Sequence, residues 1–325
     1  MSDSTQENIG AESPTPSNRL VQFAWFVVAY MIAVILWGAW VRITGSGAGC
    51  GDHWPLCDGE AIPRAPTTEK LIEYIHRVSS GLSGFLGLGL LVWVRRTMPK
   101  GHRSGRAAAV ALGFLIAEGA LGAGLVKFEL VANDDSVARA IAICLHLVNT
   151  MGLMAGYALT AWWLGRPSTV GTSAMSPRKR DAALLLAGLL GLILVGMTGA
   201  ITALGDTLFP PDTAGGASLV ERIEAELSPA MHFLVRLRII HPIVASLVAL
   251  YIALLAASQL QRSQTAKHVA AWALGLVVIQ VGAGLLNVAL KAPGYLQLTH
   301  LLIANLLWVA LLLLSAETMR PSAHT

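Results

Sequence analysis

The sequence predicts an all-α polytopic membrane protein, with eight transmembrane helices arranged as two tandem four-helix bundles related by internal duplication. Its 325 residues are 54% hydrophobic and only 13% charged, about half the charged share of a soluble domain. Eight apolar runs are each long enough to cross a bilayer, which takes about 20 residues of helix. Histidines and glycines recur at matched places in the two halves of the chain, which indicates a repeat.

The apolar runs follow one another along the whole chain, separated by polar connections. They cover residues 21–42, 72–94, 107–127, 138–164, 182–204, 235–258, 269–290 and 298–316. The first residues are rich in Ser, Pro and Glu, which is typical of disorder. The chain therefore divides into a disordered tail (1–18), an N-terminal half (19–166), a linker (167–180), a C-terminal half (181–318) and a second tail (319–325).

Basic residues predict the orientation of the spans. The connections after the second, fourth and sixth runs carry Arg and Lys, whereas the opposite connections are longer or more acidic. Both termini are therefore expected in the cytoplasm, and the even-numbered runs enter the membrane from outside. The net charge of +4 is spread over these loops, which argues against a nucleic-acid partner.

Two cysteines, Cys50 and Cys57, flank a Gly- and Pro-rich loop after the first run. On the outer, oxidising side of a membrane such a pair predicts a disulfide. Two free thiols are the less favoured alternative. The sequence does not separate a structural bond from a redox-active one.

Four histidines stand at the heads of the even-numbered runs, namely His76, His146, His241 and His300. A single histidine in a membrane helix usually forms a hydrogen bond to another helix, but four at matched positions require another explanation. Haem iron takes two axial imidazoles, and facing helices of a four-helix bundle supply them. Zinc or copper would normally take three or four close ligands. The sequence therefore predicts two bis-histidine haem sites near the outer face.

The two halves differ one helical turn before these sites, where Glu73 precedes His76 and Arg238 precedes His241. An arginine suits a haem propionate, which a guanidinium binds bidentately. A propionate would repel Glu73, so this residue is expected to face the chemistry, where a carboxylate accepts a proton or stabilises a cation. The alternative role for Glu73 is an ion pair with Arg77 or another cation.

Two further polar residues lie inside spans, Glu118 and Gln280. For both, hydrogen bonding between helices is favoured over chemistry. The remaining membrane-proximal histidines fall in connections and are expected to be solvated; they are His53, His102, His232 and His268.

Taken together, these features resemble the haem A synthase family. The loop carries Gly45-Ser46-Gly47, Cys50-Gly51 and Trp54-Pro55-Leu56-Cys57, and Glu73-Tyr74-Ile75-His76-Arg77 follows it. The resemblance also includes the four histidines and the two matched halves, and it covers the chain from about Arg19 to Glu317. It implies a bacterial inner-membrane oxidoreductase that converts the C8 methyl of haem O to a formyl group with oxygen from water, giving haem A for cytochrome oxidase.

Residue by residue, the resemblance places the substrate haem on His76 and His146 and a resident haem b on His241 and His300. Glu73 takes the position of the catalytic carboxylate. The implied partners are haem O synthase (protohaem farnesyltransferase), the assembly of cytochrome oxidase, membrane lipid and further copies of the chain as a homo-oligomer. The connection between the fifth and sixth runs lacks the second cysteine pair of some family members, so whatever that pair does is absent or done differently here.

Two other functions stay open on the sequence. One is a di-haem electron-transfer protein of the cytochrome b type, and the other is a haem chaperone or transporter with exchangeable haem at both sites. The difference between Glu73 and Arg238 argues against an electron-transfer protein, because conduction needs no acid beside one haem only.

Overall fold

The computed structural model describes residues 16–166, 179–210 and 219–320. Most of the predicted tails and linker, at 1–15, 167–178 and 321–325, lie outside the described residues. Within these ranges, eight helices are long and apolar enough to cross a membrane, which confirms the eight predicted spans. Their outward faces carry large apolar side chains such as Phe85, Ile116 and Trp272, which are 77%, 69% and 72% exposed. Such faces suit lipid and not water, so the chain is a multi-pass membrane protein.

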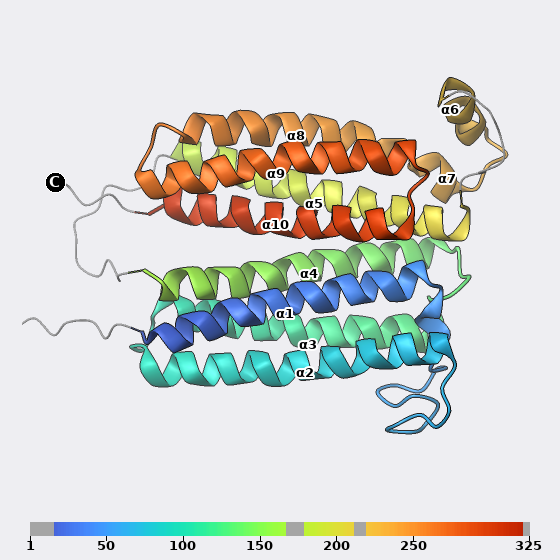
Figure 1. Ribbon diagram of the computed structural model, residues 1–325, viewed down its shortest axis with the longest axis horizontal. Coiled ribbons are helices and arrows are strands. Elements are labelled where there is room, and N and C mark those ends of the chain that lie inside the picture. The colour runs from blue at the N-terminus through green and yellow to red at the C-terminus, as the bar shows by residue number, and fades with distance from the viewer. Residues whose placement is uncertain (1–15, 167–178, 211–218, 321–325) are drawn as a thin grey trace, which may run out of the picture.

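The helices form two four-helix bundles that lie side by side (Figure 1). The first bundle contains α1 (Asn18–Ile43), α2 (Thr68–Thr97), α3 (Arg103–Lys127) and α4 (Val137–Leu164). The second contains α5 (Lys179–Leu208), α8 (Ile240–Gln259), α9 (Gln264–Ala289) and α10 (Gly294–Thr318). In each bundle every helix packs against the next and the fourth packs against the first. This common order agrees with the predicted duplication, which itself stays a prediction.

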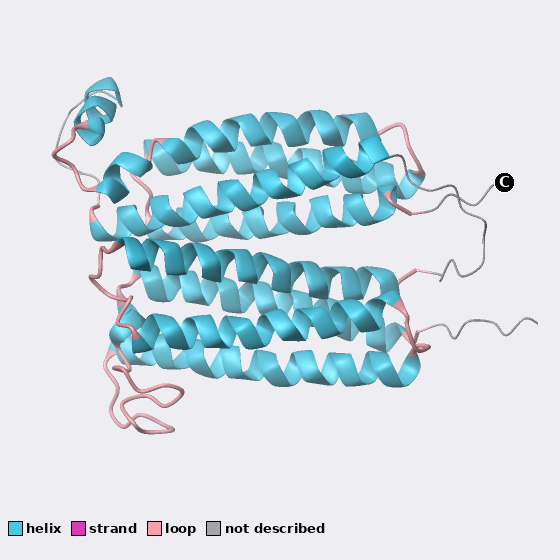
Figure 2. Ribbon diagram, turned by 180° about the vertical axis from the view of Figure 1, so that it is seen from behind, coloured by secondary structure: helices cyan, strands magenta, loops and turns pink. Residues whose placement is uncertain are grey.

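The even-numbered spans all begin at the end of the bundles that carries the loop 44–67, which we call the loop end (Figure 1). The opposite end holds the start of α1 and the end of α10, as the view from behind also shows (Figure 2). The starts of α2 and α4 are capped by Thr67 and Ser136, whose hydroxyl groups accept hydrogen bonds from backbone amides of the first turn. The loop end therefore collects the segments that contain the predicted site residues.

Short elements at the loop end were not predicted. A 3-10 turn, η1 (Ser46–Ala48), follows α1, while α6 (Leu219–Leu227) and α7 (Phe233–Leu237) precede α8. The predicted sixth run, 235–258, is thus not one continuous helix. Pro242 lies in the first turn of α8, where its missing N–H is tolerated, but its ring would clash with the Arg238 carbonyl in an unbroken helix. The break places His241 at the very start of α8.

The bundles contact each other through α1 and α4 on one side and α5 and α10 on the other. Trp308 of α10 donates a hydrogen bond to the Met151 carbonyl of α4 at 3.0 Å. Arg42, near the end of α1, donates to the Ala203 carbonyl at 2.6 Å and to Gln297 Oε1 at 2.9 Å. One guanidinium thus joins α1 to α5 and α10 at the loop end.

Replacing Arg42 with methionine is expected to lower the free energy of unfolding by about 1.5–3 kcal/mol, because carbonyl acceptors on two helices lose a charged donor. Thermal unfolding of the detergent-solubilised protein measures the change. The control is Arg262→Met, whose guanidinium pairs with Asp181 near the surface at 2.7 Å and should contribute about 1 kcal/mol or less. Equal losses in the two variants would contradict a clamp between the bundles at Arg42.

Candidate functional site

In the second bundle, the structure brings His241 of α8 and His300 of α10 together. Their ring centroids lie 6.4 Å apart and their planes cross at 86°. A metal–imidazole bond is about 2.0–2.1 Å long and the ring centre lies roughly 1 Å beyond the nitrogen, so imidazoles on opposite sides of one metal have centres about 6 Å apart. The spacing of the pair fits the two axial ligands of one haem iron.

Thr198 of α5 contacts the ring of His241. Its Oγ1 lies 3.0 Å from the Val195 carbonyl and 3.1 Å from Nδ1 of His241. When the hydroxyl proton is donated to the Val195 carbonyl, the hydroxyl oxygen can accept a proton from Nδ1. In that tautomer the lone pair of Nε2 is free for a metal, so the contact fits a ligand of haem iron.

Glycines on neighbouring helices make room for three of the four rings. A Cβ at Gly38 would lie 2.9 Å from Cε1 of His76, and a Cβ at Gly199 would lie 3.0 Å from Cε1 of His241. A Cβ at Gly284 would lie 3.2 Å from Cε1 of His300. The recurrence of these glycines in the two halves thus has a physical reason: each helix must approach a histidine ring more closely than a side chain allows.

Replacing Gly199 with alanine is expected to push the His241 ring from its place and to remove most haem from the second bundle. The reason is that a 3.0 Å approach is tighter than nine in ten real Cβ contacts, so the ring would have to move. Haem content per protein, measured after extraction, tests this. Gly282→Ala on α9 is the matched control, because nothing lies within 4 Å of its added Cβ; a loss of haem in that variant too would point to general destabilisation.

In the first bundle, the two predicted ligands are His76 of α2 and His146 of α4. Nδ1 of His146 lies 3.5 Å from Oε1 of Glu118 on α3. The Glu118 carboxylate also accepts a hydrogen bond from Asn149 of α4, so the hydrogen bonding between helices that we expected for Glu118 is confirmed. Gln280 of α9 likewise contacts α10, with its Nε2 3.1 Å from Nε2 of His300.

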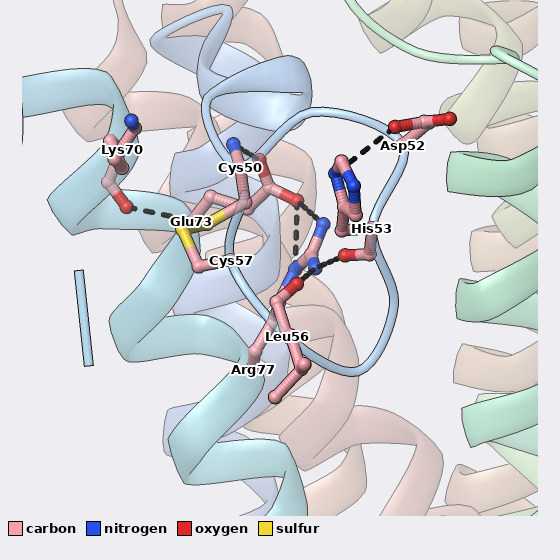
Figure 3. Close-up of polar contacts among 8 residues, drawn as sticks. All are labelled: Cys50, Asp52, His53, Leu56, Cys57, Lys70, Glu73 and Arg77. Carbon is pink, nitrogen blue, oxygen red and sulfur yellow. Dashed lines mark hydrogen bonds and ion pairs between the residues drawn. A yellow bond between two sulfur atoms is a disulfide. The ribbon is translucent and has the colours of Figure 1, made fainter. Parts of the chain in front are cut away.

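Glu73 is buried beneath the cysteine loop, with 4% of its surface exposed. Its Oε1 pairs with Arg77, at 3.0 Å from Nε and 2.5 Å from Nη2, and its Oε2 accepts the backbone N–H of Cys50 at 2.8 Å (Figure 3). Arg77 also donates to the carbonyls of His53 and Leu56. The ion pair that the sequence offered as the alternative role of Glu73 is therefore present, while its catalytic role stays a prediction.

The loop above Glu73 is closed by the predicted disulfide, since Cys50 and Cys57 are bonded to each other (Figure 3). A second tie joins the loop to α2, where Lys70 pairs with Asp58. The hydrogen bond from Lys70 holds the pKa of the Asp58 carboxyl below its usual range. The disulfide, Lys70 and the Glu73–Arg77 pair together attach the loop to the start of α2.

Arg238 has protein partners that the sequence did not predict. A haem propionate was the expected partner, which stays a prediction, and the structure places the Arg238 Nε 2.9 Å from Asp206 and its Nη1 3.5 Å from Glu226. Its Nη2 donates to the Gly205 carbonyl at 2.7 Å. Because the guanidinium is buried and already paired with two carboxylates, a propionate would have to compete with both. Asp206 and Glu226 could not be recognised from the sequence as its partners, because they lie on other helices.

One loop histidine also differs from expectation. His232 was expected to be solvated, but its ring stacks on Phe209 with centroids 4.7 Å apart. It also lies 3.4 Å from an Asp135 carboxylate. Sequence reasoning missed Thr198 and Asn149 as well, although polar residues inside apolar runs are a signal for contacts of this kind.

Comparison with known proteins agrees with this architecture. A family model described as "Cytochrome oxidase assembly protein" matches residues 21–312. The chain is 43% identical over 312 residues to a protoheme IX farnesyltransferase of Thermus thermophilus, covering 95% of this chain and 50% of that protein. It is 31% identical over 285 residues to a haem A synthase of Symbiobacterium thermophilum, covering 86% of this chain and 88% of that protein. The chain thus spans about half the length of its Thermus relative and most of the length of the Symbiobacterium one.

Proposed function

Since the chain belongs to the cytochrome oxidase assembly protein family, we propose that it is a haem A synthase that oxidises the C8 methyl of haem O to a formyl group. The observation that carries the proposal is the meeting of His241 and His300 at the starts of two even-numbered spans, with ring centroids 6.4 Å apart. The similarity to the Symbiobacterium synthase over 88% of its length supports it. The matched region makes up only 50% of the Thermus relative. The name of that longer protein is therefore weaker support for the function of this chain.

In this proposal, His76 and His146 bind the iron of the substrate haem. His241 and His300 bind a resident haem b, which supplies a one-electron acceptor close to the substrate. Thr198 keeps the ring of His241 in the orientation and tautomer that an axial ligand needs.

The reaction proceeds by two oxidations of the same carbon. Each consumes one whole water molecule and releases two electrons and two protons, so the methyl group becomes an alcohol and then a gem-diol. Loss of one water from the gem-diol leaves the aldehyde. Positive charge develops on the carbon before water attacks, and a carboxylate near it lowers the barrier.

Glu73 is the carboxylate that we assign to this role. It is buried at the start of α2, one turn before His76. Its carboxylate pairs with Arg77 one turn further along the same helix. Its contact with the Cys50 amide attaches the outer loop to the same carboxylate.

The test is pigment analysis of the protein purified after co-expression with a source of haem O. A formylated haem together with protohaem is expected. If both sites held only unmodified, tightly bound haem, the chain would be an electron-transfer protein. Readily exchangeable haem at both sites would instead identify a haem chaperone.

The enzyme that makes haem O is the expected partner. The Thermus relative named a protoheme IX farnesyltransferase contains, within one polypeptide, a region similar to nearly this whole chain. A protein that adds a farnesyl group to haem and one that oxidises a methyl of the product act in succession. Physical proximity of the two would limit the release of an apolar haem into the membrane.

We also assign the loop end to the outer face of a bacterial inner membrane, with both termini in the cytoplasm. The Arg- and Lys-rich connections lie at the opposite end, which supports this orientation. Reporter fusions after Lys100 and Ser263 are expected to be cytoplasmic, and a fusion near Asp134 is expected to be external. The opposite pattern would place the histidines on the inner side and refute the assignment.

A further inference from the structure

Two polar residues on the third helices contact the histidines of the fourth helices, but at different ring nitrogens. Glu118 on α3 lies 3.5 Å from Nδ1 of His146. Gln280 on α9 lies 3.1 Å from Nε2 of His300, whose Nδ1 has no hydrogen-bond partner among the described residues. Each histidine stands near the start of the fourth helix of its bundle. Of the two rings, His146 is therefore the one with a carboxylate facing its Nδ1.

The first bundle is also built to hold that charge. Asn149 donates to Oε2 of Glu118. The Thr150 hydroxyl, which has a single proton, lies within hydrogen-bond distance of both Oε1 of Glu118 and the His146 carbonyl. They follow His146 on α4 by three and four residues, so they share its face of the helix. The residues at the same distance from His300 on α10 are Ile303 and Ala304, which have no side-chain donor. Only the first bundle surrounds the residue opposite its histidine with donors that suit a carboxylate.

Nδ1 of His146 is buried and makes no hydrogen bond of normal length to the described residues. The Glu118 oxygen must approach by roughly 0.5 Å to reach the usual N–H···O length. A carboxylate that accepts the second N–H of a metal-bound histidine makes the imidazole a stronger electron donor. Because extra electron donation stabilises the oxidised iron, it lowers the reduction potential of a haem. A neutral amide that accepts the same N–H would lower the reduction potential less than a carboxylate does.

We infer that Glu118 is a positioning residue that accepts the Nδ1 proton of His146 and makes the substrate-haem site more reducing than a neutral residue at this position would. The inference rests on the proposed function for the assignment of His146 to haem iron. A lower reduction potential at this site would favour the loss of electrons where oxidation occurs.

The test is spectroelectrochemical titration of the purified, haem-loaded protein. Glu118→Gln is expected to raise the midpoint potential of the first site. At a fixed potential, the ratio of reduced to oxidised haem there should rise at least about tenfold, which is 59 mV for a one-electron couple. The haem of the second bundle should keep its potential.

Two controls separate the charge of Glu118 from its packing. Glu118→Asp keeps the charge and should stay close to the parent potential. Glu317→Gln removes a carboxylate at the far end of α10, where it pairs with Arg166 at 3.2 Å, and should change neither potential. If Glu118→Gln loses its haem, Asn149→Leu decides the matter. This change removes a donor to the carboxylate, which should leave more negative charge facing His146 and lower the midpoint potential, so an unchanged or raised potential would overturn the inference.

Failure of this inference can be told from failure of the proposed function. If the parent protein binds no haem through the four histidines, both are wrong. If haem binds as proposed but Glu118→Gln leaves the midpoint potential of the first site unchanged, only the role of Glu118 is refuted.

Discussion

Replacing Glu73 with glutamine is expected to lower the rate of haem A formation by roughly 10²–10³-fold, the usual effect of losing one electrostatic stabiliser of a transition state. Glutamine keeps the size of the side chain and an acceptor for the Cys50 amide, so the outer loop stays attached through that contact. The variant should bind haem in both bundles. The measurement is haem A produced per bound haem O, with haem content determined first. A hydroxylated intermediate should accumulate if the second oxidation is slowed more than the first.

The matched control for this prediction is Arg77→Gln. Arg77 forms the other half of the ion pair and contacts the carbonyls of His53 and Leu56. If Glu73 serves only to fasten the loop through Arg77, the two variants should lose activity equally. If Glu73 acts on the substrate, Arg77→Gln should retain at least about ten times the activity of Glu73→Gln, since one tenfold factor is 1.36 kcal/mol of transition-state stabilisation. Normal activity in Glu73→Gln would remove the catalytic assignment altogether.

Replacing His241 or His300 with alanine is expected to remove the resident haem and its low-spin spectrum. Each change deletes one of the two axial ligands, and the remaining ring cannot complete the coordination alone. The haem of the first bundle should remain, because no residue of that pair is altered. Optical spectra and extracted haem per protein measure both effects.

His268→Ala on α9 is the control for this pair of variants. His268 is exposed and contacts Gln264 of the same helix, so its loss should change neither haem content nor spectrum. Unchanged low-spin spectra in both His241→Ala and His300→Ala would refute the model of two bis-histidine sites.

Glu73 and Arg238 show which features of the site could be predicted from the sequence and which could not. The sequence correctly indicates that one half has an acid and the other a base one turn before the histidine. It cannot show that Arg238 is already neutralised by Asp206 and Glu226, because these residues come from α5 and α6, and their approach depends on how the connecting segments fold. The propionate contact proposed for Arg238 loses much of its support for this reason.

The eight spans, the placement of a histidine near the start of each even-numbered one and the cysteine pair could all be derived from the sequence alone. Lipid requires continuous apolar helices whose backbone hydrogen bonds are internal, so hydropathy directly reveals the spans. Polar residues that interrupt such runs are equally visible. By contrast, the contacts of Glu118 with His146, of Thr198 with His241 and of Arg42 with the second bundle depend on the rotation and relative height of packed helices. These follow from close packing of side chains over the whole bundle, so they could be recognised only in the folded protein.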